Sequence, residues 1–145
     1  MAITQAICNS FKKELLEGDH NFDSGGDVFK LALYTSAATL DSSTTVYTST
    51  NEVAASGQYT AGGGALVNSG TSVVGGVAFC DFADLSFTGV TLTARGALIY
   101  NTSATVANAA VAVLDFSSDK TATSGTFTIV FPADTSAAAI LRISG

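Results

Sequence analysis

The chain of 145 residues is long enough for one domain with a single core. Charged residues make up 12% of it, about half the usual share, so Ser, Thr, Asn and Gly must supply the polar surface. The formal net charge is −6 and the six basic residues are scattered along the chain, which excludes a surface that neutralises many phosphates together. We therefore expect neither nucleic acid nor an anionic membrane surface as a partner.

The start of the chain lacks the basic and apolar pattern of a signal peptide, and no run approaches the ~18 apolar residues that cross a bilayer. We therefore expect a protein that is made in a cytoplasm and is soluble there. The two cysteines, Cys8 and Cys80, follow no metal-binding spacing. Buried, reduced thiols are the main interpretation, and a disulfide within or between subunits is the alternative.

A helix is predicted over residues 4–17, with Thr4 as its cap and Gly18 as its stop. Apolar residues recur along one side of this helix at the spacing of helical turns. The members of this stripe are Ile7, Cys8, Phe11, Leu15 and Leu16. The stripe needs a surface to cover, and we expect that surface to be the face or end of a sheet.

After Gly18 the apolar period changes from about 3.6 to 2, which predicts strands. In the first strand, residues 28–35, one face carries Phe29, Leu31 and Leu33. A polar stretch at 36–64 follows, with a short strand predicted at 46–50. Further strands are predicted at 65–68, 77–82, 88–93, 96–101, 110–116, 126–131 and 139–143. Turn-forming residues separate them at 75–76, 84, 101–103, 117–119 and 132–134.

Many short strands with no helices between them indicate a mainly β fold. We predict an antiparallel β-sandwich or barrel with one N-terminal α-helix. No linker divides the chain, so residues 1–145 are predicted to form a single domain, in which residues 28–143 are the β domain.

The most suggestive polar cluster is the segment that begins at Asp19. Asp19, Asn21 and Asp23 have the alternate spacing of the first ligands in a calcium-binding loop. The sixth position is Ser24 where glycine is needed, and the twelfth is Lys30 in place of a bidentate glutamate. We therefore interpret the segment as a polar turn and predict no metal or cofactor site.

His20 is the only histidine, and it lies in this polar segment, where we expect it to be solvated rather than catalytic. Two carboxylate pairs, Asp81 with Asp84 and Asp115 with Asp119, have spacings that could serve glycoside hydrolysis. Acids at strand ends and in turns are the commoner explanation for both pairs. The sequence therefore predicts no catalytic residue and no enzyme.

Several segments resemble a family of small bacteriophage virion proteins that is common in phages of aquatic bacteria. The similar segments are residues 6–16 (AICNSFKKELL), 29–36 (FKLALYTS), 51–64 (NEVAASGQYTAGGG), 93–101 (TARGALIYN), 110–120 (AVAVLDFSSDK) and 125–132 (GTFTIVFP). They follow one another in order over most of the chain, and none is a catalytic signature. The resemblance implies a virion component that is placed on the head surface or in tail or fibre structures.

The leading hypothesis is a capsid decoration (cement) protein that stabilises the head surface. Its partners would be the major capsid protein or other virion proteins, with self-association, and it would end up in the virion. The helix at 4–17 or the long loop at 36–64 could supply the contact. The alternative is a tail, baseplate or fibre component involved in host attachment. A glycan hydrolase comes third, because it requires a carboxylate pair that the sequence does not single out.

Overall fold

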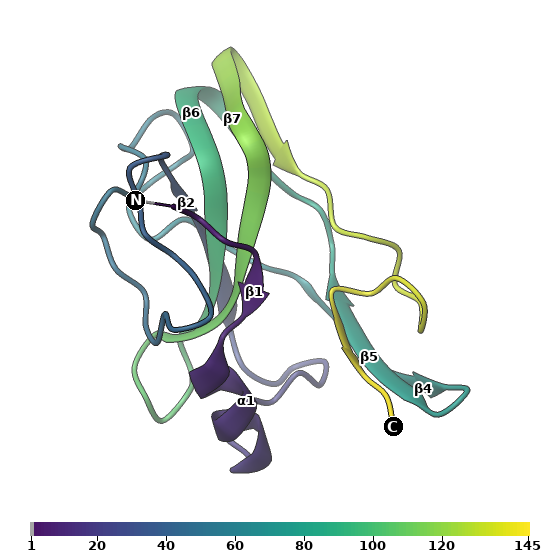
Figure 1. The fold of residues 1–145 in the computed structure, drawn as a ribbon. Helices are drawn as coiled ribbons and strands as arrows, with labels where there is room; N and C mark the ends of the chain where they lie inside the picture. The colour runs from purple at the N-terminus through teal and green to yellow at the C-terminus, as the bar shows by residue number, and fades with distance from the viewer. Residues whose placement is uncertain (1) are drawn as a thin grey trace.

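The computed structural model describes residues 2–145 and shows a mainly β protein with one short helix near the N-terminus (Figure 1). All strand pairs within its two sheets are antiparallel. One sheet has five strands in the order β1-β7-β6-β2-β3, and the other has three in the order β4-β5-β8. The predicted antiparallel fold is confirmed in its sandwich form, since these two sheets do not close into a barrel.

The elements have the following bounds. The five-stranded sheet contains β1 (Ala6–Ile7), β2 (Phe29–Tyr34), β3 (Gly64–Ala65), β6 (Leu85–Asn101) and β7 (Ala109–Ile129). The three-stranded sheet contains β4 (Asn68–Val74), β5 (Val77–Phe82) and β8 (Leu141–Ile143). The helix α1 covers Asn9–Leu16.

The helix is shorter than predicted, and its predicted cap is wrong. Residue Cys8 is the N-cap and makes no side-chain capping hydrogen bond. The preceding residues are taken up by β1, which pairs with Val113 and Ala112 of β7. Because the backbone of residues 6–7 is extended in this ladder, the helix begins only after it, although the apolar spacing of the sequence starts earlier.

The long strands β6 and β7 replace four shorter strands of the prediction. They pair along their length, and register shifts interrupt the ladder at several points. The turn predicted at 117–119 is wrong, because pairing with β6 continues beyond it at Ala94↔Lys120 and Thr93↔Thr121. Ser117, with a positive φ of 70°, is a local irregularity inside β7. Such irregularities bend a ribbon without ending it, and Figure 1 shows the β6–β7 ribbon folding over at its top.

The interior strand β2, which lies between β6 and β3, is buried on both faces, whereas its sequence alternation predicted only one face in the core. Leu31, Ala32 and Leu33 are all fully buried. The second face is covered by the long loop at 36–63, whose Leu40 and Tyr59 are buried against the sheet. The strand predicted at 46–50 is reduced to a single bridge within this loop.

The carboxylate of Glu52 is the hydrogen-bonding centre of the long loop. Glu52 accepts hydrogen bonds from the hydroxyls of Tyr47 and Tyr59 and from the amide of Gly62. The Tyr59 and Gly62 donors both lie 2.7 Å from Oε2. Tyr100 of β6 then donates to the Gly62 carbonyl at 2.6 Å, which ties the loop to the sheet.

The strand β4 (Asn68–Val74) was not predicted from the sequence. The strand expected at 65–68 overlaps it only at Asn68. The turn predicted at 75–76 is confirmed. Gly75 and Gly76 have φ values of 58° and 79° between the paired residues Val74 and Val77. Two positive φ values in a two-residue loop are the geometry of a type I′ turn, which glycine adopts at little cost.

A row of phenylalanines connects the two sheets. Phe29 of β2 stacks on Phe22 at 4.3 Å between ring centroids, and it lies 5.7 Å from Phe82 of β5. Phe82 in turn meets Phe131 edge to face at 5.7 Å. All four rings are buried, so this row is the apolar contact through which the three-stranded sheet is anchored.

Candidate functional site

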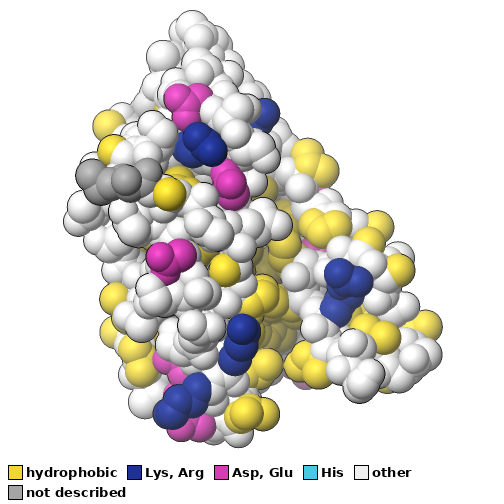
Figure 2. Space-filling model, viewed as in Figure 1, with side chains coloured by type: hydrophobic (Ala, Val, Ile, Leu, Met, Phe, Trp, Pro, Cys, Tyr) yellow, Lys and Arg dark blue, Asp and Glu magenta, His cyan; other side chains and the backbone are white. Residues whose placement is uncertain are grey.

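An open apolar groove of about 750 Å³ separates α1 from the three-stranded sheet. Figure 2 shows it as a hollow lined by hydrophobic side chains between the two halves of the molecule. One wall carries Ile7, Phe11 and Leu15, three members of the apolar stripe predicted for the helix. Leu16, which was predicted to widen that stripe, points away from it and is 91% exposed.

The opposite wall comes from β5 and β8. Ala78 pairs with Ile143, and Cys80 pairs with Leu141. Directly paired residues of antiparallel strands project from the same face, and so do residues two positions apart. These four side chains therefore share one face, and all four line the groove.

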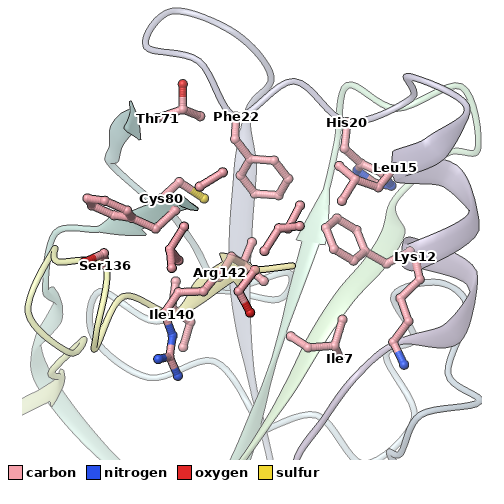
Figure 3. Close-up of a pocket in the computed structure, with 17 residues that line it drawn as sticks. Ile7, Lys12, Leu15, His20, Phe22, Thr71, Cys80, Ser136, Ile140 and Arg142 are labelled. Carbon is pink, nitrogen blue, oxygen red and sulfur yellow. The ribbon is translucent and has the colours of Figure 1, made fainter. Parts of the chain in front are cut away.

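The inner end of the groove is formed by His20 and Phe22 (Figure 3). The prediction that His20 is solvated is wrong, because its side chain is fully buried. Its ring lies 4.8 Å from the ring of Phe11. Its two nitrogens each lie 2.9 Å from a partner, Glu14 Oε1 on one side and Asn101 Nδ2 on the other. A polar ring is tolerated in this apolar setting because both nitrogens are hydrogen-bonded.

The surrounding bonds fix the tautomer of His20. Asn101 Oδ1 accepts from the Ser103 amide, so its Nδ2 is the donor, bonding to Asp27 and to His20 Nδ1. Nδ1 is therefore an acceptor, and Nε2 carries the proton that is donated to Glu14. With both nitrogens engaged and the ring buried, His20 serves to join the helix to the sheet rather than to react with a ligand.

The charged side chains that line the groove, those of lysine and arginine, are positive. Its 17 lining residues include Lys12 and Arg142 but no aspartate or glutamate, although the chain contains 12 acidic residues. Figure 3 shows these two side chains on opposite sides of the groove, with their cationic ends extending toward the same side. Arg142 is positioned by a 2.7 Å hydrogen bond from Nη1 to the carbonyl of Ala137.

A second hollow, of about 610 Å³, lies beside the bent part of β7. Its lining mixes aromatic residues with one acid, Asp115, and one base, Lys120. Because the two charges are opposite, this hollow has no preference for a ligand of either sign. The groove beside α1 is therefore the more distinctive surface of the two.

The residues with calcium-loop spacing, Asp19, Asn21 and Asp23, are hydrogen-bonded within the protein, Asn21 and Asp23 to each other and Asp19 to a distant loop. The amide of Asp23 donates to Asn21 Oδ1 at 3.0 Å, as in an Asx turn, and Thr105 donates to Asp19 Oδ1 at 2.9 Å. Within residues 2–145, no three His, Cys, Asp or Glu side chains come together in a way that could hold a metal ion.

The predicted carboxylate pairs lie in different surroundings. Asp115 contacts Arg95 at 3.4 Å, whereas Asp119 is exposed within β7. Asp81 lies one residue before the end of β5, near a strand end as expected, but it is buried, with only 1% of its surface exposed. Burial raises the pKa of the Asp81 carboxyl, and its Oδ2 has no hydrogen-bond partner.

Both cysteines are buried and unpaired in the structure. Burial raises the pKa of the Cys8 thiol to about 11 and that of Cys80 to about 12. A raised pKa lowers the fraction of thiolate, which is the reactive form, so neither cysteine has the environment of a nucleophile.

Across residues 2–145, the helix is too short to cross a membrane. Comparisons with models of protein families, with curated proteins and with solved structures gave no significant match.

Proposed function

We propose that the protein is a decoration protein of a bacteriophage head, which binds the assembled shell and stabilises it. The observation that carries this proposal is the open apolar groove between α1 and the β5–β8 wall, in which the ring of His20 is held by two hydrogen bonds and burial raises the pKa of the Cys80 thiol. Exposed apolar surface of this kind marks interaction sites, among which protein–protein contacts are a main class.

The sequence supports the same conclusion. The segments that resemble phage virion proteins follow one another in the same order along most of the chain. They include the helix that contributes to one wall of the groove. The acidic balance of the chain disfavours a position that faces packaged DNA. A place on the outside of the shell fits both features.

Icosahedral symmetry makes a modest contact sufficient. A shell presents the same binding surface many times, and a protein that bridges two subunits of the shell holds both at once. A groove of this size on each copy therefore supports stable decoration without a large interface.

Hydrolysis of glycans is less well supported by the same geometry. A glycosidase needs two carboxyl groups on either side of the scissile bond. The groove has no carboxylate in its lining, and the second hollow has only Asp115. Both hollows are therefore better suited to binding than to this reaction.

The test is to mix the purified protein with preassembled, expanded shells that lack it. We expect binding that saturates at a symmetry-related copy number, and shells that resist heat and chelators better once they are decorated. Assembly of the shell itself should not need the protein.

Imaging of whole particles decides between the head and the tail. Density for the protein confined to the tail, together with bare shells that are equally robust, would overturn the proposal. That result would favour the alternative of a tail, baseplate or fibre component.

A further inference from the structure

We propose that the groove between α1 and β8 binds an extended, apolar segment of the shell protein that carries acidic side chains. This inference rests on the proposed function and names the contact through which decoration takes place. Three features of the groove support it: its apolar walls, the free edge of β8 and the sign of its charges.

The walls keep apolar surface in contact with solvent. Ile7 on β1, Leu15 on α1 and Leu141 on β8 are only partly buried, and Ile143 is 61% exposed. Apolar surface favours any partner that removes it from water. Figure 2 shows the hollow open to the outside, so a chain segment could enter it from solvent.

The free edge of β8 indicates that the bound segment is extended. It is the last strand of the order β4-β5-β8, so one of its edges has no partner strand in the described structure. Figure 1 shows β8 on the side of its sheet nearer to β1 and α1, and residues 141–144 line the groove. Extended segments add to free strand edges through backbone hydrogen bonds, while pockets beside the edge select their side chains.

The charges specify acidic side chains on that segment. Two of the six basic residues of the chain border the groove, Lys12 on the helix and Arg142 at the rim. Arg142 projects from the face of β8 opposite to Leu141 and Ile143. None of the acidic residues lines the groove. The molecule as a whole has a net charge of −6, whereas the border of the groove is positive. Complementary charge guides the encounter and fixes the orientation of a bound segment.

The first test reverses the two groove charges together. Lys12 and Arg142 are both exposed, so the variant Lys12→Glu/Arg142→Glu should fold normally, which its melting temperature checks. The matched control is Lys13→Glu/Lys120→Glu, which makes the same change in net charge at exposed positions outside the groove. We expect the groove variant to bind empty expanded shells about tenfold or more weakly than wild type, and the control to bind about as well as wild type.

The second test identifies the occupant. A photo-crosslinking benzoylphenylalanine replaces Leu15 in the groove wall, or replaces Val46 in the long loop as a control. After illumination of decorated shells, we expect a crosslink from position 15 to an apolar segment of the shell protein that contains aspartate or glutamate. Position 46 should give no such product.

The outcomes separate the two proposals. If wild type binds shells and the groove variant binds equally well, the groove inference is wrong and the decoration proposal stands. A crosslink from position 15 to a second copy of this chain, or one to the shell protein from position 46 alone, also overturns the groove inference. If wild type itself does not bind shells, both proposals fail.

Discussion

Asp81 is the residue whose charge is least well accommodated in the fold. Its carboxyl is buried within β5, and Oδ1 accepts from the amide of Phe82 at 2.9 Å while Oδ2 is unpartnered. Burial disfavours the ionised form and outweighs the nearby amides, so the pKa is raised above its ordinary value of 3.8. An uncompensated buried charge of this kind lowers stability at neutral pH.

We therefore expect Asp81→Asn to stabilise the protein at pH 7, by about 1 kcal/mol, the lower end of what a buried polar group without a hydrogen bond costs. The substitution keeps an oxygen for the Phe82 amide and removes the charge. Below the unfolded-state pKa, near 4, Asp81 is protonated in both the folded and the unfolded protein, so its burial takes little from the free energy of unfolding. As pH rises above that value, only the unfolded state ionises freely, so the stability of the wild type falls relative to the variant.

Urea unfolding at pH 7 and at pH 4 measures this effect. The advantage of the variant should shrink at the lower pH. Asp119→Asn is the matched control, because Asp119 is exposed and the same change there should leave stability within about 0.5 kcal/mol. An Asp81→Asn protein that is less stable than wild type at pH 7 would contradict this account of the carboxyl.

The environments of single residues were the hardest features to predict from the sequence. His20 stands among Asp and Asn residues that indicate a solvated turn, yet it is buried. Its partner Glu14 is close in sequence, but Asn101 is 81 positions away. Local composition describes only neighbours in the chain, and it therefore misses a burial that a distant strand produces.

At the scale of elements, Glu52 determines how the long loop is attached. Oε2 accepts two hydrogen bonds, and an amide nitrogen in its place would face two donors. We expect Glu52→Gln to lower the free energy of unfolding by about 2 kcal/mol, because bonds to a charged acceptor are lost and donors are left unpaired. Limited proteolysis should also cut within residues 36–63 faster than in wild type.

The matched control is Glu17→Gln on the helix. Glu17 is exposed and pairs with Lys13 at i+4, a contact that solvent screens and that contributes little to stability. Denaturant unfolding followed by circular dichroism compares the two variants. Equal stability of Glu52→Gln and wild type would show that the loop is held by apolar burial alone.

The sequence predicted the elements unevenly, and the reasons are physical. The apolar stripe of Ile7, Phe11 and Leu15 was recognised and lines one wall of the groove, although Ile7 belongs to β1 and only Phe11 and Leu15 to α1. Both strands of the opposite wall, β5 and β8, were predicted at 77–82 and 139–143. The sequence missed β4, which has few apolar residues and whose pairing with β5 depends on a turn and on long-range packing. The residues at 117–119 look like a turn, but pairing with β6 carries the chain through them as an irregular strand.

The whole molecule should respond to alkaline pH in one step. All four tyrosines of the chain, Tyr34, Tyr47, Tyr59 and Tyr100, have a raised pKa, chiefly because burial disfavours the phenolate. The pKa of Tyr100 rises to about 12 from an ordinary value of 10.0. Glu52 adds to the effect on each of them, since its negative charge lies close to the four hydroxyls.

The sign of the pH dependence follows from linkage. Below pH 10.0 the phenols are protonated in both states, and the tyrosines do not oppose folding. Above that value the unfolded chain releases protons that the folded chain retains, so the free energy of unfolding falls as pH rises. The buried thiols act in the same direction from their ordinary pKa of 9.0 upward.

We therefore expect phenolate absorbance and loss of β-sheet circular dichroism to follow the same alkaline transition, because the tyrosines ionise when the fold opens. A tyrosine amide titrated alongside gives the ordinary reference curve, and the protein's transition should lie at higher pH and be steeper. If the four tyrosines instead ionised gradually near the reference pKa while the circular dichroism stayed constant, the loop that covers β2 would have to open independently of the sheet. The coincidence of the two signals thus tests whether the loop, the Glu52 contacts and the five-stranded sheet form one cooperative unit.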